Sequence, residues 1–368
     1  MKKQRICHAL TAVAVLAAAA LLAGCAQLGY YVQAAQGQFA LLAAARPIDD
    51  WLAEPGLAPA LRQKLAAVRE MRTFAARELG LPDNGSYKRY ADLQRPFALW
   101  NVVAAPALEL KAVEWCFPIA GCVNYRGYYD RSDAQAFAEG LRRQGYDVQV
   151  AGVPAYSTLG WFNDPVLSTF IKYPDGELAR LVFHELAHQV VYVKNDSQFN
   201  ESFAVAVEEA GVERWMASHG NAAMRQAYVA YEGRKRDFLD LLLGYRKRLA
   251  LNYAGQGSDA DTLRVKALIF QDLQQDYRQL KIHWGGYAGY DRWFTEPLSN
   301  AHLVSVATYH DLVPGFRNIL KQAGSLPQFY ESVRQLARLD ETSRHRQLAL
   351  AAGDEALAAH GGKRNEAH

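Results

Sequence analysis

The chain has 368 residues, of which half are apolar, so it is long enough to bury a sizeable hydrophobic core. Its formal net charge at pH 7 is only +3, and it contains no basic run interleaved with aromatic residues. This composition argues against a nucleic-acid-binding protein, and we expect no nucleic-acid partner.

The first 24 residues have the pattern of a targeting segment. Basic residues precede an apolar run over residues 9–20, which is too short for a transmembrane span. The run ends in Leu22-Ala23-Gly24-Cys25, which resembles a bacterial lipoprotein processing site. We expect cleavage before Cys25, a lipid anchor on Cys25, and a periplasm-facing location in the cell envelope, at the outer membrane. The alternative is an ordinary secretory signal.

The next part of the chain changes from helical to strand patterns. Residues 29–80 read as helical, most clearly over 57–79, before Gly80 and Pro82 end the pattern. The following predicted elements are strands 97–103, 108–115 and 123–129, helix 132–144 and strand 146–153.

Two cysteines remain beyond the targeting segment and the lipidation site. Cys116 and Cys122 flank a segment with Pro118 and Gly121, as in a tight turn between strands. Because the expected compartment is oxidising, we predict a disulfide between them. A metal pair is the alternative, although no further Cys or His lies near in sequence.

Residues 184–188 read His-Glu-Leu-Ala-His within a predicted helix. Side chains four residues apart share one face of a helix, so both imidazoles can reach one ion. Glu185 can then take a proton from a water on that ion, the arrangement of zinc hydrolases. The alternative is a surface helix that carries these three residues on its solvent-exposed face, but Leu178, Val182 and further apolar residues make this helix apolar nearly all round. Buried His and Glu side chains need partners, and a metal is one.

A catalytic zinc site needs a third protein ligand and an open position. Glu201 is our candidate, because a short polar loop lets a second helix fold back against the first. The alternative ligand is Glu208, which lies seven residues further on the same helical face. If Glu201 is the ligand, we expect Glu208 to hydrogen-bond a histidine ligand at its other ring nitrogen and so fix its tautomer. We expect one Zn²⁺ per chain.

His-Glu-x-x-His followed by Asn200-Glu201-Ser202-Phe203-Ala204 resembles the glutamate-liganded zinc peptidases, such as thermolysin and the alanyl-type aminopeptidases. The chain is more closely similar to a bacterial lipoprotein family of predicted aminopeptidases. That resemblance covers most of the mature chain and rests on segments 29–38, 115–129, 155–162, the zinc helices and 300–316. It departs from the alanyl-type enzymes in a shorter spacing from His188 to Glu201 and in lacking their Gly-x-Met-Glu-Asn segment.

The resemblance also implies an oxyanion donor from the C-terminal helical half. Tyr309 and His310 are the candidates there, and the alternative is that one tyrosine among many is without a role. His283 and Tyr287 are weaker candidates. The aromatic segment 156–164 is expected either to bind the substrate backbone, through Gly160 and Trp161, or to be a packed loop.

These elements predict an α+β fold, with a small mixed β-sheet, N-terminal helices, the active-site helix pair and a mainly α-helical C-terminal half. The expected parts are a signal peptide (1–24), an N-terminal helical segment (25–96), a peptidase core (97–220), a helical subdomain (221–352) and a flexible tail (353–368).

The function that follows is a membrane-anchored zinc peptidase, with a peptide substrate and an aminopeptidase activity implied by the resemblance. The alternatives are an endopeptidase of the same mechanism, a non-proteolytic zinc amidase of the cell wall, and a catalytically silent lipoprotein that keeps zinc for structure.

Overall fold

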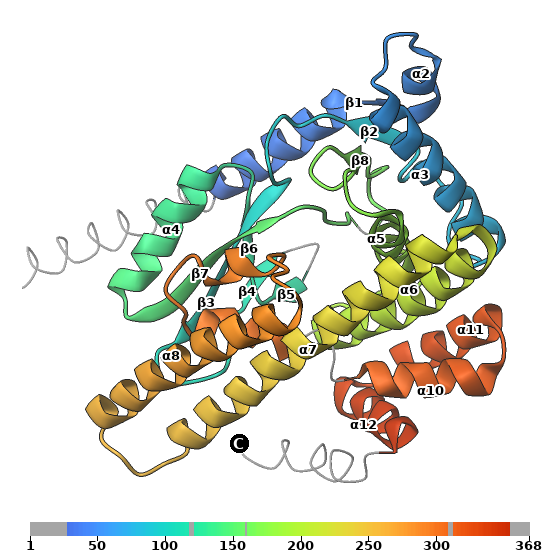
Figure 1. Ribbon diagram of the computed structural model, residues 1–368. Coiled ribbons are helices and arrows are strands. Elements are labelled where there is room, and N and C mark those ends of the chain that lie inside the picture. The colour runs from blue at the N-terminus through green and yellow to red at the C-terminus, as the bar shows by residue number, and fades with distance from the viewer. Residues whose placement is uncertain (1–27, 118–120, 159, 308–311, 354–368) are drawn as a thin grey trace, which may run out of the picture.

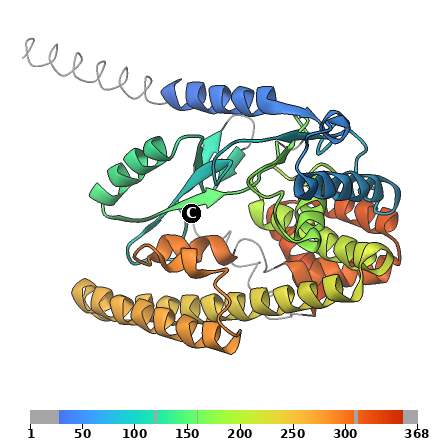
Figure 2. The same cartoon turned by 45° about the horizontal axis from the view of Figure 1, so that its top comes forward.

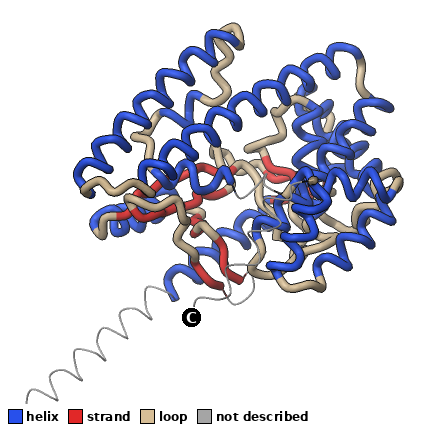
Figure 3. The backbone as a smooth tube through the Cα atoms, turned by 90° about the horizontal axis from the view of Figure 1, so that it is seen from below, coloured by secondary structure: helices blue, strands red, loops and turns tan. Residues whose placement is uncertain are grey.

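The computed structural model describes residues 28–117, 121–158, 160–307 and 312–353. Helices make up most of the described chain, and the strands form small groups among them (Figure 3). The part of the chain after residue 221 is almost entirely helical. The predicted α+β class with a helical C-terminal half is therefore confirmed.

The strands are β1 (Ala45–Pro47), β2 (Arg89–Ala91), β3 (Leu99–Pro106), β4 (Trp115–Phe117), β5 (Gly121–Val123), β6 (Arg126–Tyr128), β7 (Tyr146–Val153) and β8 (Val166–Leu167). The helices are the N-terminal helix (residues 28–44), α2 (Ile48–Ala53), α3 (Pro59–Arg77), α4 (Arg131–Arg143), α5 (Asp175–Ala187), α6 (Ser197–His219), α7 (Ala222–Tyr253), α8 (Asp259–His283), the 3₁₀ turn η1 (Asp291–Phe294), α9 (Asn300–Ala307), α10 (Val313–Ala323), α11 (Leu326–Ala337) and α12 (Glu341–Ala352).

One antiparallel sheet, in the order β6-β3-β7, has a helix on each face. Along β3, Val102 and Ala104 face the core shared with α4, whereas Val103 and Ala105 face α9. Successive side chains of a strand point to opposite faces, so the apolar run of β3 covers both sides.

The other two sheets are smaller. Strands β1, β2 and β8 form a mixed sheet, in which β2 pairs with β1 antiparallel and with β8 parallel. Strands β4 and β5 form a hairpin. The strand predicted over residues 108–115 is wrong, because only Trp115 of that range lies in a strand and residues 109–114 have no regular structure. This segment alternates apolar and charged residues, but its contact with β3 is the single hydrogen bond from the Val113 N–H to the Ala104 carbonyl, at 2.8 Å, and it forms no ladder.

Helices α5 and α6 pack against each other in the largest hydrophobic core. Helix α5 begins after Pro174, and its first residue, Asp175, pairs with Lys64 at 2.6 Å. Helix α6 is capped by Asp196, whose side chain accepts the Phe199 N–H at 3.0 Å.

The C-terminal half supports the α5–α6 pair from two sides. Helices α7 and α8 form a long hairpin that runs beneath both the sheet and the helix pair (Figure 2). Helix α10 packs on α6, where Phe316 contacts Phe199 and Phe203 through ring centroids 5.1 and 5.9 Å apart. The site helices thus lie between two helical supports (Figure 1).

Within the ranges described, no helix combines the length and the hydropathy that crossing a membrane requires.

Candidate metal centre

The two histidines of the motif and one glutamate of α6 converge on a single point. His184 lies in the last turn of α5, His188 is its C-cap residue, and Glu201 lies one turn into α6. The Nε2 atom of His184 is 3.2 Å from one carboxylate oxygen of Glu201, and the Nε2 atom of His188 is 3.7 Å from the other. One donor atom from each of the three residues lies within 4.8 Å of the others.

The loop between α5 and α6 is fastened next to Glu201. The buried side chain of Asn200 accepts the Val193 N–H and donates to the Val193 carbonyl, both at 2.8 Å. This pair of bonds fixes where α6 begins relative to α5. It therefore fixes which residue of α6 faces the histidines.

Glu208 lies behind His184 and does not face the convergence point. One carboxylate oxygen of Glu208 is 2.8 Å from Nδ1 of His184, and it also accepts a hydrogen bond from Arg180 at 3.1 Å. Lys235 of α7 approaches the other oxygen at 3.5 Å. Glu208 is 1% exposed, so these cations compensate a charge that has almost no contact with solvent. Burial raises the pKa of Glu208, but Arg180 and His184 outweigh burial and hold it well below its usual range.

The donor set fits a zinc ion. Ligand atoms about 2.1 Å from a tetrahedral zinc ion lie roughly 3.4 Å from each other, close to the spacings between Glu201 and the two imidazoles. When Nδ1 of the neutral His184 ring donates to Glu208, its Nε2 presents a lone pair toward Glu201, so two acceptors face each other. Either a proton on Nε2 or a metal ion at the convergence point resolves that conflict, so the place favours a cation.

The electrostatics of the two imidazoles agree with this arrangement. Burial lowers the pKa of His184, but hydrogen bonds to Glu201 and Glu208 outweigh burial and raise it to about 10, so the cluster favours positive charge at this place. Burial lowers the pKa of His188 to about 4, so at neutral pH this ring is uncharged and keeps a lone pair for a metal.

Glu185 lies beside the convergence point in a largely buried environment. Burial raises the pKa of its carboxyl group to about 7, although the charge of His184 opposes the shift. The charge of Asp164, from the segment before β8, also raises it. A carboxylate with a pKa near neutrality can both take up and release a proton at physiological pH.

One family model matches the chain, described as "Putative aminopeptidase", and it covers residues 29–348. The chain belongs to this aminopeptidase family. No curated protein and no solved structure matches it. The matched range includes the helices that carry His184, Glu185, His188 and Glu201.

The remaining residues expected from the sequence have different outcomes. Tyr309 and His310, the expected oxyanion donors, and Cys25, the expected lipidation site, lie outside the described residues. Trp161 is 69% exposed, and Gly160 has a φ of +82° with Gln189 as its nearest neighbour. The structure therefore places Gly160 beside the residue that follows His188, while the Trp161 side chain extends into solvent.

A cavity of about 290 Å³ adjoins the centre and includes residues that sequence reasoning missed. It is lined by His184 and Glu185 together with Pro154, Ala155, Arg180, Leu181, Val205, Glu208 and Lys235. Pro154 and Ala155 directly follow β7, so the chain leaving that strand forms one wall. Pro154 and Ala155 directly precede the aromatic segment 156–164, which was expected to be near the substrate. No sequence pattern indicated Lys235, which lies on α7.

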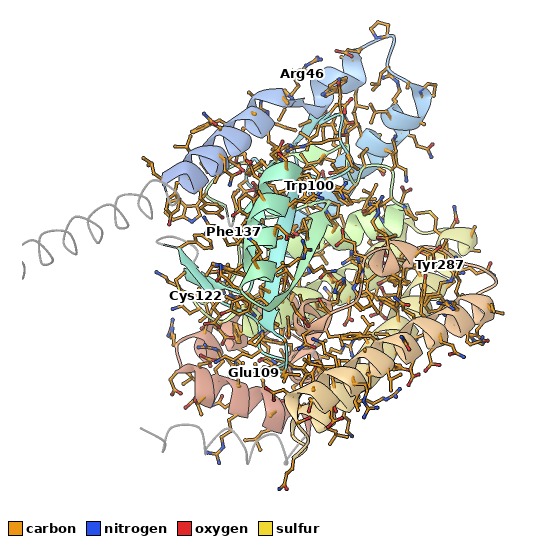
Figure 4. The ribbon with its side chains drawn as sticks, turned by 90° about the vertical axis from the view of Figure 1, so that its left-hand side faces the viewer. Arg46, Trp100, Glu109, Cys122, Phe137 and Tyr287 are labelled. Carbon is orange, nitrogen blue, oxygen red and sulfur yellow. A yellow bond between two sulfur atoms is a disulfide. The ribbon has the colours of Figure 1, made fainter. Side chains whose placement is uncertain are left out.

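The two cysteines lie in the β4–β5 hairpin and form a disulfide (Figure 4). Cys116 and Cys122 are also direct partners in the strand register.

Proposed function

We propose that the protein is a zinc-dependent peptidase, in which His184, His188 and Glu201 hold one Zn²⁺ per chain and Glu185 is the general base. The observation that carries this proposal is the convergence of two imidazoles and the Glu201 carboxylate, with one donor atom from each within 4.8 Å of the others, beside the half-buried carboxyl group of Glu185. Membership of the aminopeptidase family supports a peptide substrate.

Zinc, when bound, would supply a water of lowered pKa and polarise the carbonyl that is attacked. The chain's own residues do the rest. Glu185 accepts the proton of the attacking water and passes it to the leaving amine, which its pKa of about 7 suits. Glu208 holds the His184 ring in one tautomer and orientation. The chain at Pro154 and Ala155 offers backbone groups to a substrate in the adjoining cavity.

We also propose that the mature protein is anchored to the bacterial cell envelope by lipid on Cys25 and faces the periplasm. The Leu22-Ala23-Gly24-Cys25 pattern supports this location. The disulfide between Cys116 and Cys122 agrees with it, because structural disulfides persist in oxidising compartments.

The central test compares metal content with turnover. The purified protein should hold one zinc per chain by mass spectrometry, and His184→Ala and His188→Ala should lose it. Glu185→Gln should keep zinc while kcat falls by roughly 10² or more. A panel of aminoacyl amides, N-blocked peptides and peptidoglycan fragments gives the substrate class.

Glu213→Gln is the matched control, because Glu213 is an exposed glutamate on α6. It should change neither zinc content nor turnover. Full zinc retention in both histidine variants, or wild-type turnover in Glu185→Gln, would contradict the proposal.

A further inference from the structure

The N-terminal helix, residues 28–44, lies along the outside of the molecule with one face packed on the protein (Figure 2). On this inner face, the Tyr30 ring stacks on Phe117 with centroids 5.6 Å apart. Gly37 approaches Tyr129 so closely that a Cβ atom at position 37 would overlap the Tyr129 ring. The helix is therefore firmly docked, and its orientation relative to the rest of the protein is set.

Polar contacts of the inner face reach the wall of the cavity beside the metal centre. The Tyr129 hydroxyl group donates to Oε1 of Gln38 at 2.7 Å, and the Tyr156 hydroxyl group donates to the same oxygen. Tyr156 directly follows Ala155, which lines the cavity. The position of the helix is thereby tied to that of the proposed active site.

The outer face of the helix is apolar. Leu28 is 64% exposed, Val32 45% and Phe39 63%, and their spacing places them on one helical face. The exposed residues of the helix are Leu28, Gly29, Tyr31, Val32, Ala35, Gln36, Phe39, Ala40, Ala43 and Ala44. None of them is charged, whereas the solvent face of a surface helix is normally charged or polar. A contiguous exposed apolar face marks a surface that contacts a membrane or another protein.

The position of Cys25 in the sequence favours a membrane. Cys25 is three residues before Leu28, and three residues of chain span at most about 11 Å in any conformation. Acyl chains on Cys25 would therefore hold the start of the helix at the bilayer surface. The helix is roughly 25 Å long, so its outer face can lie along that surface. Exposed tyrosines such as Tyr31 are favoured at this level of a membrane.

We propose that the outer face of the N-terminal helix lies on the lipid bilayer, with Leu28, Val32 and Phe39 inserted at the boundary between headgroups and acyl chains. The lipid holds the protein at the membrane, and the helix fixes the orientation in which it is held. Because the inner face is bonded to Tyr156, the cavity beside the metal centre keeps one orientation above the membrane. This inference rests on the proposed lipid anchor at Cys25 and goes beyond the proposed peptidase activity.

A fluorescent label at the far end of the helix tests insertion. Ala43→Cys, on the same face as Phe39, is labelled in the lipidated protein with an environment-sensitive fluorophore. Cys116 and Cys122 do not take the label, because they form a disulfide. In vesicles of phosphatidylethanolamine and phosphatidylglycerol, the emission should shift to the blue. Lipids brominated in their acyl chains should quench it.

Leu251→Cys is the control position, because Leu251 is an apolar residue of α7 that is 68% exposed. Helix α7 lies on the opposite side of the molecule from the N-terminal helix (Figures 1 and 2). A label at Leu251→Cys should neither shift in emission nor be quenched by the brominated lipids.

Negative charge on the outer face should prevent insertion. Val32→Glu/Phe39→Glu should abolish the blue shift and the quenching at Ala43→Cys, because burying a carboxylate among acyl chains is costly. Val229→Glu/Leu251→Glu is the matched control, since these residues of α7 are 70% and 68% exposed, and it should leave the quenching unchanged. Both double variants alter exposed positions, so zinc content, turnover and melting temperature should stay at wild-type values.

Fatty acid in the wild-type protein without quenching at Ala43→Cys would overturn the inference and leave the lipid anchor in place. Quenching that persists in Val32→Glu/Phe39→Glu would overturn it as well. Disulfide crosslinks between two Ala43→Cys chains, with no quenching by lipid, would assign the face to a second copy of the protein instead.

Failure of the proposed anchor is distinguishable, because the wild-type protein would then contain no fatty acid, and the inference would fall with it. The peptidase proposal is tested separately by zinc content and by the turnover of Glu185→Gln, since neither depends on this helix.

Discussion

At the scale of single residues, Glu201 and Glu208 share one helix and one buried cluster but face His184 from opposite sides. Glu201 approaches Nε2 at 3.2 Å, together with His188, whereas Glu208 approaches Nδ1 at 2.8 Å. One carboxylate can therefore bind a metal, and the other can only act on it through the imidazole.

We predict that Glu201→Ala abolishes zinc binding at ordinary concentrations. Glu208→Gln should leave an occupied site with affinity weakened roughly 10- to 100-fold, the usual effect of losing a group that orients a ligand. Titration with a competing chelator measures both affinities. If Glu208→Gln lost zinc while Glu201→Ala kept it with weakened affinity, Glu208 would be the ligand.

Asp164 gives a prediction about pH. Burial raises its pKa to about 6 from 3.8, against the hydrogen bonds from Thr158 that lower it. Between these values the unfolded chain has released the proton and the folded chain keeps it. The unfolded state then binds fewer protons, so this group makes stability fall as pH rises from about 4 to about 6.

Asp164→Asn should remove that dependence. The free energy of unfolding of the variant, relative to wild type, should rise by ~2 kcal/mol between pH 4 and pH 7. Urea unfolding at both values measures it. Asp50→Asn, at an exposed position of α2, is the control and should show no comparable change. If the difference in free energy of unfolding between Asp164→Asn and wild type were the same at both pH values, Asp164 would ionise normally in the folded state.

The residues that could be predicted for the site are those whose placement depends on local geometry. His184, Glu185 and His188 follow from helical periodicity, and Glu201 and Glu208 follow from a short loop and a second helix. Lys235 could not be predicted, because long-range packing alone brings it to the cavity. No spacing in the sequence records that packing.

At the scale of elements, the start of α6 is held by the last helix of the described chain. Asp196 caps α6 and accepts hydrogen bonds from Arg344 of α12 at 2.9 and 2.5 Å. Their side chains are 2% and 4% exposed, so this is a buried ion pair. His345 approaches the same carboxylate at 2.9 Å. Helix α12 thereby fixes the helix end that presents Glu201.

We predict that Arg344→Met destabilises the protein by about 3–5 kcal/mol, because it leaves the buried Asp196 charge without its main partner. Zinc affinity should fall as well, because the start of α6 is no longer held. Adding Asp196→Asn should recover part of the lost stability. Chemical unfolding and a metal titration measure the two effects.

Arg334→Met is the control, because Arg334 pairs with Glu331 on the exposed face of α11. Its effect should be within about 0.5 kcal/mol of zero. Wild-type stability in Arg344→Met would mean that the ion pair does not hold α6.

Most elements were predictable because their patterns are local, including α4, β7 and the long α7 and α8. Residues 108–115 show where this fails. An alternating apolar and charged pattern has strand character, but it becomes a strand only when a ladder of hydrogen bonds pairs it with a neighbour, and here a single bond joins Val113 to Ala104 of β3. The pairing of sheets depends on the whole topology, which residue patterns do not contain.

At the scale of the whole molecule, the lipid anchor gives the prediction that concerns location. Labelled fatty acid should enter the wild-type protein and not Cys25→Ser, because the thiol is the acceptor. The serine variant should also move from the membrane fraction to the soluble fraction of cells. Cys7→Ser, within the predicted signal peptide, is the control and should remain labelled. Labelling of the Cys25→Ser protein would place the anchor elsewhere.

The three proposed metal donors all lie in one stretch of chain, from His184 to Glu201, closed by the bonds of Asn200 to Val193. Closing so short a loop costs little conformational entropy, and contacts that are near in sequence form early in folding. We therefore expect a chain emerging unfolded from secretion to capture its metal at this helix pair first. The disulfide hairpin and the distant Arg344 would assemble around a centre that is already loaded, so metal supply at the proposed location outside the cytoplasm would influence how fast the protein matures.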